Sequence, residues 1–168
     1  MNRFQLMFED PESQKRWDNY FHKICEAVST KSPCLSRQIG AILVRDKSII
    51  STGYNGPARG YKHCRGNKPK TIAAHATCPR KLKGYTSGEG LHECPAGHAE
   101  VNSIINAARN GVSVMGATLY MNCIIPCKDC AIAIVNAGIK EIVIDELTPF
   151  HEMSLGILEG IIIRRFNL

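Results

Sequence analysis

The chain has 168 residues, of which 44% are hydrophobic and 21% are charged, as expected for one globular domain with a sizeable core. Its longest apolar runs, such as Ala131–Val135, are too short to cross a bilayer, and the N-terminal segment lacks the basic start and apolar stretch of a secretory signal. We therefore expect a cytoplasmic protein with no membrane contact. A net charge of +6 suits an anionic small molecule, nucleic acid or an ordinary solvated surface, and does not decide between them.

Hydrophobic periodicity predicts alternating helices and strands. Apolar residues recur at spacings of three and four across Pro11–Lys31, which indicates an amphipathic helix, and two short apolar runs then suggest a hairpin. The pattern predicts strands at Ile39–Val44 and Ile49–Tyr54, a helix at Ala99–Asn110, a strand at Thr118–Asn122, a helix from Pro126 or Cys127 to Gly138, a strand at Glu141–Ile144, a weak helix at Glu152–Glu159 and a strand at Ile161–Phe166. Such alternation is typical of layered α/β proteins.

A long segment between the hairpin and the second helix has a different character. Residues 56–97 are rich in Gly, Pro, Lys, Cys and His and show no apolar periodicity. A structureless loop of this length is uncommon inside a domain, so something must order it. We interpret residues 1–168 as a single domain that carries a Cys/His-rich insertion at about 56–97. The high cysteine count, without a secretion signal, favours metal binding over disulfides.

Two short motifs carry the chemistry: His98-Ala99-Glu100 and Pro126-Cys127-Lys128-Asp129-Cys130. Both fall at expected helix N-termini. Cys127 and Cys130 share one face of a first helical turn, where the helix dipole favours thiolate. His98 would complete a three-ligand zinc site. Catalytic zinc keeps its fourth position for water, whereas structural zinc is usually closed by four protein ligands.

Glu100 follows His98 by two residues, so its carboxylate can lie beside a zinc-bound water without binding the metal. It would move a proton from that water to a ring nitrogen and then to a leaving amine. The pattern H-x-E…P-C-x-x-C is the signature of zinc-dependent nucleobase deaminases. Either half alone is weak, because structural zinc knuckles and redox dithiols share C-x-x-C. The competing interpretation is a closed zinc site that uses another Cys or His.

With these motifs the chain resembles the deoxycytidylate deaminase family, within the cytidine deaminase-like superfamily. The resemblance runs from Trp17 to Ile144 and includes W-D-x-Y-F, C-L-S-R-Q-I-G-A-I-L-V, S-T-G-Y-N-G-P, S-G-E-G-L, H-A-E-V-N, A-A-R-N-G, G-A-T-L-Y, P-C-K-D-C and A-G-I-K. It implies a three-layer α/β/α fold with a central mixed sheet of about five strands. It also implies hydrolytic deamination of dCMP to dUMP, which supplies dUMP for dTMP synthesis. By resemblance His98, Cys127 and Cys130 hold the zinc, and Glu100 moves protons.

The resemblance assigns further residues and partners. Asn55 matches an asparagine that contacts the nucleotide, although Asn-Gly is also a common turn pair. Ala99, in the H-A-E-V-N motif, is expected at the substrate. Arg109 matches a position near subunit contacts and substrate, with a solvated helix charge as the alternative. Arg37 is a candidate for the substrate phosphate, because arginine can grip phosphate with two parallel hydrogen bonds. A hexamer, and control by dCTP and dTTP, are also implied.

A second zinc is expected from the insertion, since several family members carry one in this region. Four thiolates would close a tetrahedral structural site, with Cys34, Cys64, Cys78 and Cys94 as the candidate ligands. Three nearby histidines, His63, His75 and His92, leave the ligand set open, and buried thiols that bind nothing are the alternative. Cys25 and Cys123 are expected in the core. After Ile144 the chain departs from the tyrosine-rich segment of its relatives.

Other functions share these motifs. A deaminase acting on tRNA or single-stranded DNA would need a basic groove with stacking residues, and only 7% of this chain is aromatic, which disfavours nucleic acid. A deaminase of dCTP or free cytidine has the same zinc motifs. A protein of another class, a non-catalytic zinc-stabilised binding protein, has no use for Glu100.

Overall fold

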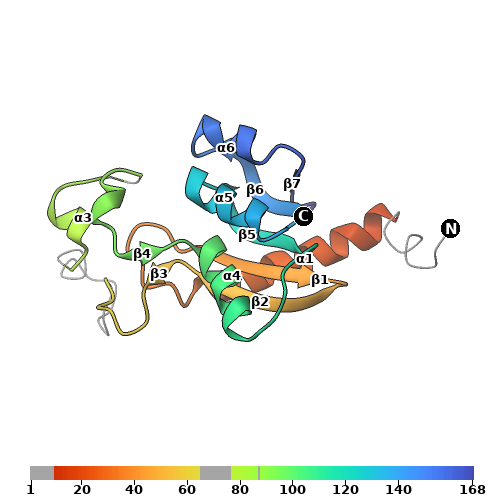
Figure 1. Ribbon diagram of the computed structural model, residues 1–168, viewed down its shortest axis with the longest axis horizontal. Helices are drawn as coiled ribbons and strands as arrows, with labels where there is room; N and C mark the ends of the chain where they lie inside the picture. Colours follow the sequence, from red (N-terminus) through yellow and green to blue (C-terminus); the bar gives the residue numbers. More distant parts are fainter. Residues whose placement is uncertain (1–9, 65–76, 87) are drawn as a thin grey trace.

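A five-stranded mixed sheet forms the centre of the molecule (Figure 1). The computed structural model describes residues 10–64, 77–86 and 88–168. The strands lie in the order β2-β1-β5-β6-β7; they are β1 Gly40–Arg45, β2 Ser48–Tyr54, β5 Thr118–Ile125, β6 Glu141–Pro149 and β7 Ile162–Arg165. β1 runs antiparallel to β2 and β5, whereas β5, β6 and β7 are parallel. The predicted mixed sheet of about five strands is confirmed.

Helices cover both faces of this sheet. α1 (Pro11–Ser29) packs on one face, and α4 (Ala99–Arg109) and α5 (Lys128–Asn136) pack on the other, with α6 (Glu152–Ile157) beside α5. Alternate residues of each strand point to opposite faces of the sheet, so the strands contribute side chains to two separate hydrophobic cores. Ile42, Tyr120 and Val143 meet the α1 side, while Leu43, Leu119 and Ile142 meet the α4 and α5 side. The predicted three-layer α/β/α arrangement is therefore confirmed.

Two strands extend beyond their predicted ends. β5 continues to Ile125 and β6 to Pro149. Past Ile144 the segment Asp145–Leu147 is charged and largely exposed, so it has no apolar face for periodicity to detect. It stays in the sheet through irregular pairing with the end of β5, where Ile124 pairs with Glu146. The extension brings the ends of β5 and β6 to the edge where the second motif begins.

An ion pair between the first helix and the last strand closes the far side of the fold. Asp18 of α1 is fully buried, and it accepts hydrogen bonds from Arg164 of β7 at 2.6 and 3.1 Å. Arg164 also donates to Glu141 at 2.7 Å. A buried carboxylate requires such partners, so this network fixes the end of the chain against α1.

The insertion is closed at its base by a second, two-stranded sheet. β3 (Gly56–Pro57) pairs with β4 (Ala96–Gly97), directly before His98. Between them lie the short helix α3 (Pro79–Leu82) and a 3-10 turn at Leu91–Glu93. The helix predicted at Pro11–Lys31 is present as α1, and the three later predicted helices are present as α4, α5 and α6. In the described part of the chain, no helix is long and apolar enough to span a membrane.

Candidate active site

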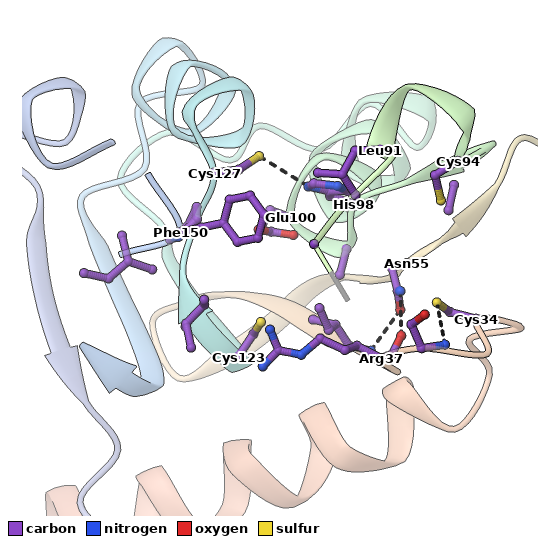
Figure 2. A pocket seen from close by; sticks show the side chains of 18 of the residues that line it. Cys34, Arg37, Asn55, Leu91, Cys94, His98, Glu100, Cys123, Cys127 and Phe150 are labelled. Carbon is purple, nitrogen blue, oxygen red and sulfur yellow. Dashed lines mark hydrogen bonds between the residues drawn. The ribbon is translucent and has the colours of Figure 1, made fainter. Parts of the chain in front are cut away.

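Two helix starts place three potential metal ligands together. His98 is the N-cap residue of α4, and Cys127 is the N-cap residue of α5 with Cys130 one turn further along. The Nδ1 atom of His98 lies 3.4 Å from the sulfur of Cys127 and 3.3 Å from that of Cys130. Figure 2 shows the imidazole turned toward the Cys127 sulfur. The two motifs are far apart in the sequence but close in space, because α4 and α5 begin at the same edge of the sheet.

The spacing of these atoms fits zinc. With Zn–S of about 2.3 Å and Zn–N of about 2.0–2.1 Å, tetrahedral ligands lie about 3.5 Å apart. Within residues 10–64, 77–86 and 88–168, His98, Cys127 and Cys130 are the one group of three or more His, Cys, Asp or Glu whose ligand atoms all lie within 4.8 Å of one another. Three protein ligands would leave a fourth position for water.

The two thiols have pKa values that are shifted in opposite directions. A hydrogen bond from Cys130, helped by His98, lowers the pKa of Cys127 to about 4. The same hydrogen bond with Cys127, together with burial, raises the pKa of Cys130. Hydrogen bonding to Cys127 also raises the pKa of His98. Thiolate character at Cys127 is what metal binding requires.

Glu100 stands beside the three ligands and is not one of them. Its side chain lies in the first turn of α4, is only 5% exposed, and faces the cavity next to His98 (Figure 2). Burial raises the pKa of its carboxyl group, and the nearby His98 partly opposes this. A carboxyl group whose pKa is raised above its ordinary value is suited to accept and return a proton.

A cavity of about 310 Å³ opens onto these residues. This volume is at the lower end of the roughly 300–1,000 Å³ of small-molecule sites. Its walls come from the loop before β1, the insertion, the end of β5 and the loop after β6. The lining includes the predicted site residues Cys34, Arg37, Asn55, Cys94, His98, Ala99, Glu100 and Cys127. Ala99 is fully buried at its floor.

Asn55 binds the loop that carries Arg37. Its amide donates to the main-chain carbonyl of Arg37 at 2.8 Å, and its oxygen accepts from the hydroxyl of Ser32 and the amide of Ile39. Figure 2 shows the hydrogen bond between Asn55 and Arg37 at the edge of the cavity, with the Arg37 side chain reaching toward Cys123. Asn55 therefore shapes the wall, in addition to the turn expected from Asn-Gly.

Arg109 lies elsewhere. It is exposed at the end of α4 and lines a separate hollow with Arg59 and Asn106. Within one chain it does not reach the cavity that holds Glu100. A role at the substrate would have to come from contact between two copies.

The cysteines of the insertion gather next to the same cavity. Burial, followed by the neighbouring Cys78, Cys94 and Cys34, raises the pKa of Cys64 to about 12. All eight cysteines are free thiols, and Cys25 and Cys123 are buried as predicted. Three of the four candidate sulfurs come from the insertion and the fourth, that of Cys34, from the loop before β1. In the described part of the chain, no three of them all lie within 4.8 Å of one another, as the ligand atoms of the His98 group do. His92 is exposed, and His75 lies outside the described residues.

Sequence reasoning did not single out several lining residues, among them Arg80, Leu91 and Phe150. Phe150 follows β6 and Leu91 belongs to the insertion, and the two appear around Glu100 in Figure 2. Neither lies in a motif with its own chemistry. Arg80 is a charged residue that is only 5% exposed. Arg80 lies two residues after Cys78, in a segment without apolar periodicity, so the sequence gave no indication that it is buried.

Comparison with known proteins identifies the class. The family model described as cytidine and deoxycytidylate deaminase zinc-binding region matches residues 15–146. The chain belongs to this family of zinc-binding deaminases, as the motifs predicted. The match contains both His98-Ala99-Glu100 and the Cys127–Cys130 pair.

Individual relatives narrow the resemblance. The chain is 34% identical to the deoxycytidylate deaminase of Saccharomyces cerevisiae over 94% of its own length, and spans 47% of that protein. It is 35% identical to the deoxycytidylate deaminase of Mycobacterium phage D29, covering 78% of this chain and 95% of the phage protein. A crystal structure of dCMP deaminase from the cyanophage S-TIM5 with dCMP and dUMP has the same fold, with a TM-score of 0.66, 24% identity and coverage of 93% and 98%.

Proposed function

We propose that this chain hydrolyses dCMP to dUMP and ammonia with the help of one zinc ion. The observation that carries the proposal is the buried carboxylate of Glu100 beside a three-ligand group that leaves a coordination position free. A structural zinc site would have no need for an acid–base group at that place. The names of the relatives in fungi and phages point to the same substrate.

The chemistry divides between the metal and the protein. Zinc, when bound, would lower the pKa of a water molecule toward about 7 and so supply hydroxide near neutral pH. Glu100 would move one proton of that water to the ring nitrogen N3 as the water oxygen bonds to C4. It would then carry the second water proton to the exocyclic amine, which leaves as ammonia when the C4–N bond breaks. His98, Cys127 and Cys130 would hold the metal, and the buried floor at Ala99 would seat the base.

The substrate class is supported by the charges of the cavity. Among the described residues that line it are two arginines, Arg37 and Arg80, and one carboxylate, that of Glu100. Such a cavity favours an anion, and we propose Arg37 as a ligand of the 5′-phosphate. The cyanophage enzyme of the same fold binds dCMP and dUMP. Free cytidine, dCTP and polynucleotides remain the competing substrates.

The test is an ammonia-release assay with zinc-loaded protein and cytidine, dCMP, dCTP and an oligonucleotide. We expect dCMP to be the best substrate. Glu100→Gln should retain zinc and fold but lose roughly 10²- to 10⁴-fold in kcat, the usual contribution of acid–base catalysis. The matched control is Glu159→Gln at an exposed position. Undiminished turnover by Glu100→Gln would falsify the mechanism.

We further propose a second, structural zinc bound by Cys34, Cys64, Cys78 and Cys94. The support is the burial of Cys64 and Cys78 and the mutual influence of the four sulfurs. Metal binding would draw these thiolates together and order the insertion. On this view residues 1–168 form one deaminase domain, with residues 56–97 as a zinc-stabilised insertion. Free thiolate ligands are compatible with a reducing, cytoplasmic location.

Assembly and regulation follow from the family resemblance. We propose a homo-oligomer, most simply the hexamer, in which Arg109 lies at a subunit contact. Its exposed position and the neighbouring Arg59 support this placement. Activation by dCTP and inhibition by dTTP are part of the same proposal. Light scattering, and the assay above with each effector added, test these points.

A further inference from the structure

Arg80 is a buried cation in the wall of the cavity. It comes from the short helix α3 of the insertion, is only 5% exposed, and lines the same space as His98 and Glu100. Charged residues are seldom buried without a partner of opposite charge. What balances this charge is therefore informative about what the cavity binds.

Two main-chain carbonyls hold the Arg80 guanidinium. The nearest opposite charge that acts on it is the Glu89 carboxylate, whose pKa is lowered by hydrogen bonds from Thr86 and also by Arg80, without an ion pair among the described residues. The Arg80 Nε donates to the carbonyl of Glu89 and its Nη2 to the carbonyl of Thr86, both at 2.5 Å. The carboxylate of Glu89 is turned instead to the amide and hydroxyl of Thr86, at 2.9 and 2.7 Å. Among the described residues no carboxylate oxygen lies within 4.0 Å of the Arg80 nitrogens.

Three of the five guanidinium N–H groups are left over. The two carbonyl bonds use one hydrogen of Nε and one of Nη2, and Nη1 has no hydrogen-bond partner in the described part of the chain. Guanidinium donors in a fixed fork match the oxygens of a phosphate. The two carbonyls fix the plane of the fork, so less entropy is lost when an anion binds.

We propose that Arg80 binds the 5′-phosphate of the nucleotide and thereby makes the insertion a determinant of substrate specificity. This inference rests on the proposed function, because it concerns the same cavity. Arg80 would act together with Arg37, which reaches the cavity from the loop before β1. The nucleotide would then be held by two separate segments, and a nucleoside without phosphate would lose both contacts.

The experiment compares dCMP with deoxycytidine for Arg80→Gln, using the zinc-loaded full chain. We expect kcat/KM for dCMP to fall roughly 10- to 100-fold, as for loss of a hydrogen bond to a charged group, with a less than threefold change for deoxycytidine. Lys83→Gln is the matched control, because it removes an equal charge from the exposed end of the same helix. Equal losses for both substrates, or no loss for dCMP, would overturn the proposal.

A binding measurement separates this inference from the proposed function. Calorimetry with dUMP and deoxyuridine needs no turnover, so it reports on Arg80 even if the wild-type chain proves inactive. Arg80→Gln should weaken dUMP at least tenfold and leave deoxyuridine unchanged. Arg80→Lys keeps the charge but cannot make both carbonyl bonds, and should recover part of the dUMP affinity. No binding of dUMP to the wild type, or no recovery by lysine in a folded variant, would contradict the phosphate contact.

Discussion

The side-chain amide of Asn55 donates a hydrogen bond of 2.8 Å to the main-chain carbonyl of Arg37. Asn55 directly follows β2, and Arg37 lies in the loop before β1. This bond therefore lets the end of β2 fix the position of that loop, which lines the cavity. Asn55 also binds Ser32 and Ile39, so one buried amide fixes both ends of the loop.

Asn55→Ala should therefore act on stability and on substrate binding together. The change leaves the amide of Ile39 and the carbonyl of Arg37 without partners, which costs about 1–3 kcal/mol. We expect a lower unfolding midpoint in urea and a higher KM for dCMP, because the Arg37 loop loses its anchor. Asn106→Ala is the control, since its amide binds the carbonyl of Thr52 away from the cavity. An unchanged KM in the destabilised variant would contradict a role in positioning Arg37.

Gly53→Ala should separate α4 from the sheet. A Cβ atom at Gly53 would lie 2.3 Å from the amide nitrogen of Ser103 and 2.5 Å from the carbonyl oxygen of Ala99. Both are main-chain atoms, so the helix must move, at about 1–3 kcal/mol or more. Because α4 begins at His98, the displacement should also reduce zinc binding.

The control for this prediction is Gly156→Ala in α6. A Cβ atom there meets nothing within 4 Å. Alanine is the better helix former by roughly 0.5–1 kcal/mol, so this variant should be neutral or slightly more stable. Thermal unfolding and zinc content of the two variants form the comparison. A Gly53→Ala protein with full zinc content and normal stability would show that the contact is less tight than the structure indicates.

Single cysteine variants should remove the two proposed zinc ions independently. We expect two zinc per wild-type chain by elemental analysis, and one in each of Cys127→Ser and Cys64→Ser. Cys127→Ser should lose activity while keeping most of its thermal stability, because α5 is held by the core around Ile134. Cys64→Ser should show the larger loss of stability, since structural zinc contributes directly to folding. A wild-type content of one zinc would contradict the second site.

Alkaline pH should destabilise the fold partly through Cys25. Burial raises the pKa of this thiol well above its ordinary value of 9.0. The unfolded chain therefore loses the proton first, so the free energy of unfolding is largest below about pH 9 and falls above it. The slope for one group approaches about 1.4 kcal/mol per pH unit. Urea unfolding between pH 8 and 10.5 should show a shallower decline for Cys25→Ala; equal slopes would contradict this assignment.

The sequence predicted most of the layered core because each of its elements has at least one buried face, and β1 has two. The periodicity of α1 and the apolar runs of β1 and β5 reflect the two clusters on either side of the sheet. The end of β6 was missed for the same reason: Glu146 pairs with Ile124 but has no core to face. Membership of the deaminase family and the three-layer fold were both predicted correctly.

The site was predictable where its ligands are close in sequence and not where the insertion supplies them. Spacing placed Glu100 beside His98, and a motif of four residues placed Cys127 with Cys130. Arg80 has no such spacing to its partners, since its carbonyl acceptors at Thr86 and Glu89 are main-chain atoms without a residue signature. The role proposed for Arg109 would need a second copy of the chain, which neither periodicity nor a single-chain fold describes.

The short pairing of β3 with β4 closes the insertion at its base, immediately before His98. Changes of length between Pro57 and Ala96 are therefore absorbed beyond that closure and need not be transmitted to α4. Loop length itself has a small entropic effect once the ends are joined. Related proteins can therefore differ in the segment between β3 and β4 while the residues around His98 stay the same. Substrate specificity would then evolve separately from the reaction itself.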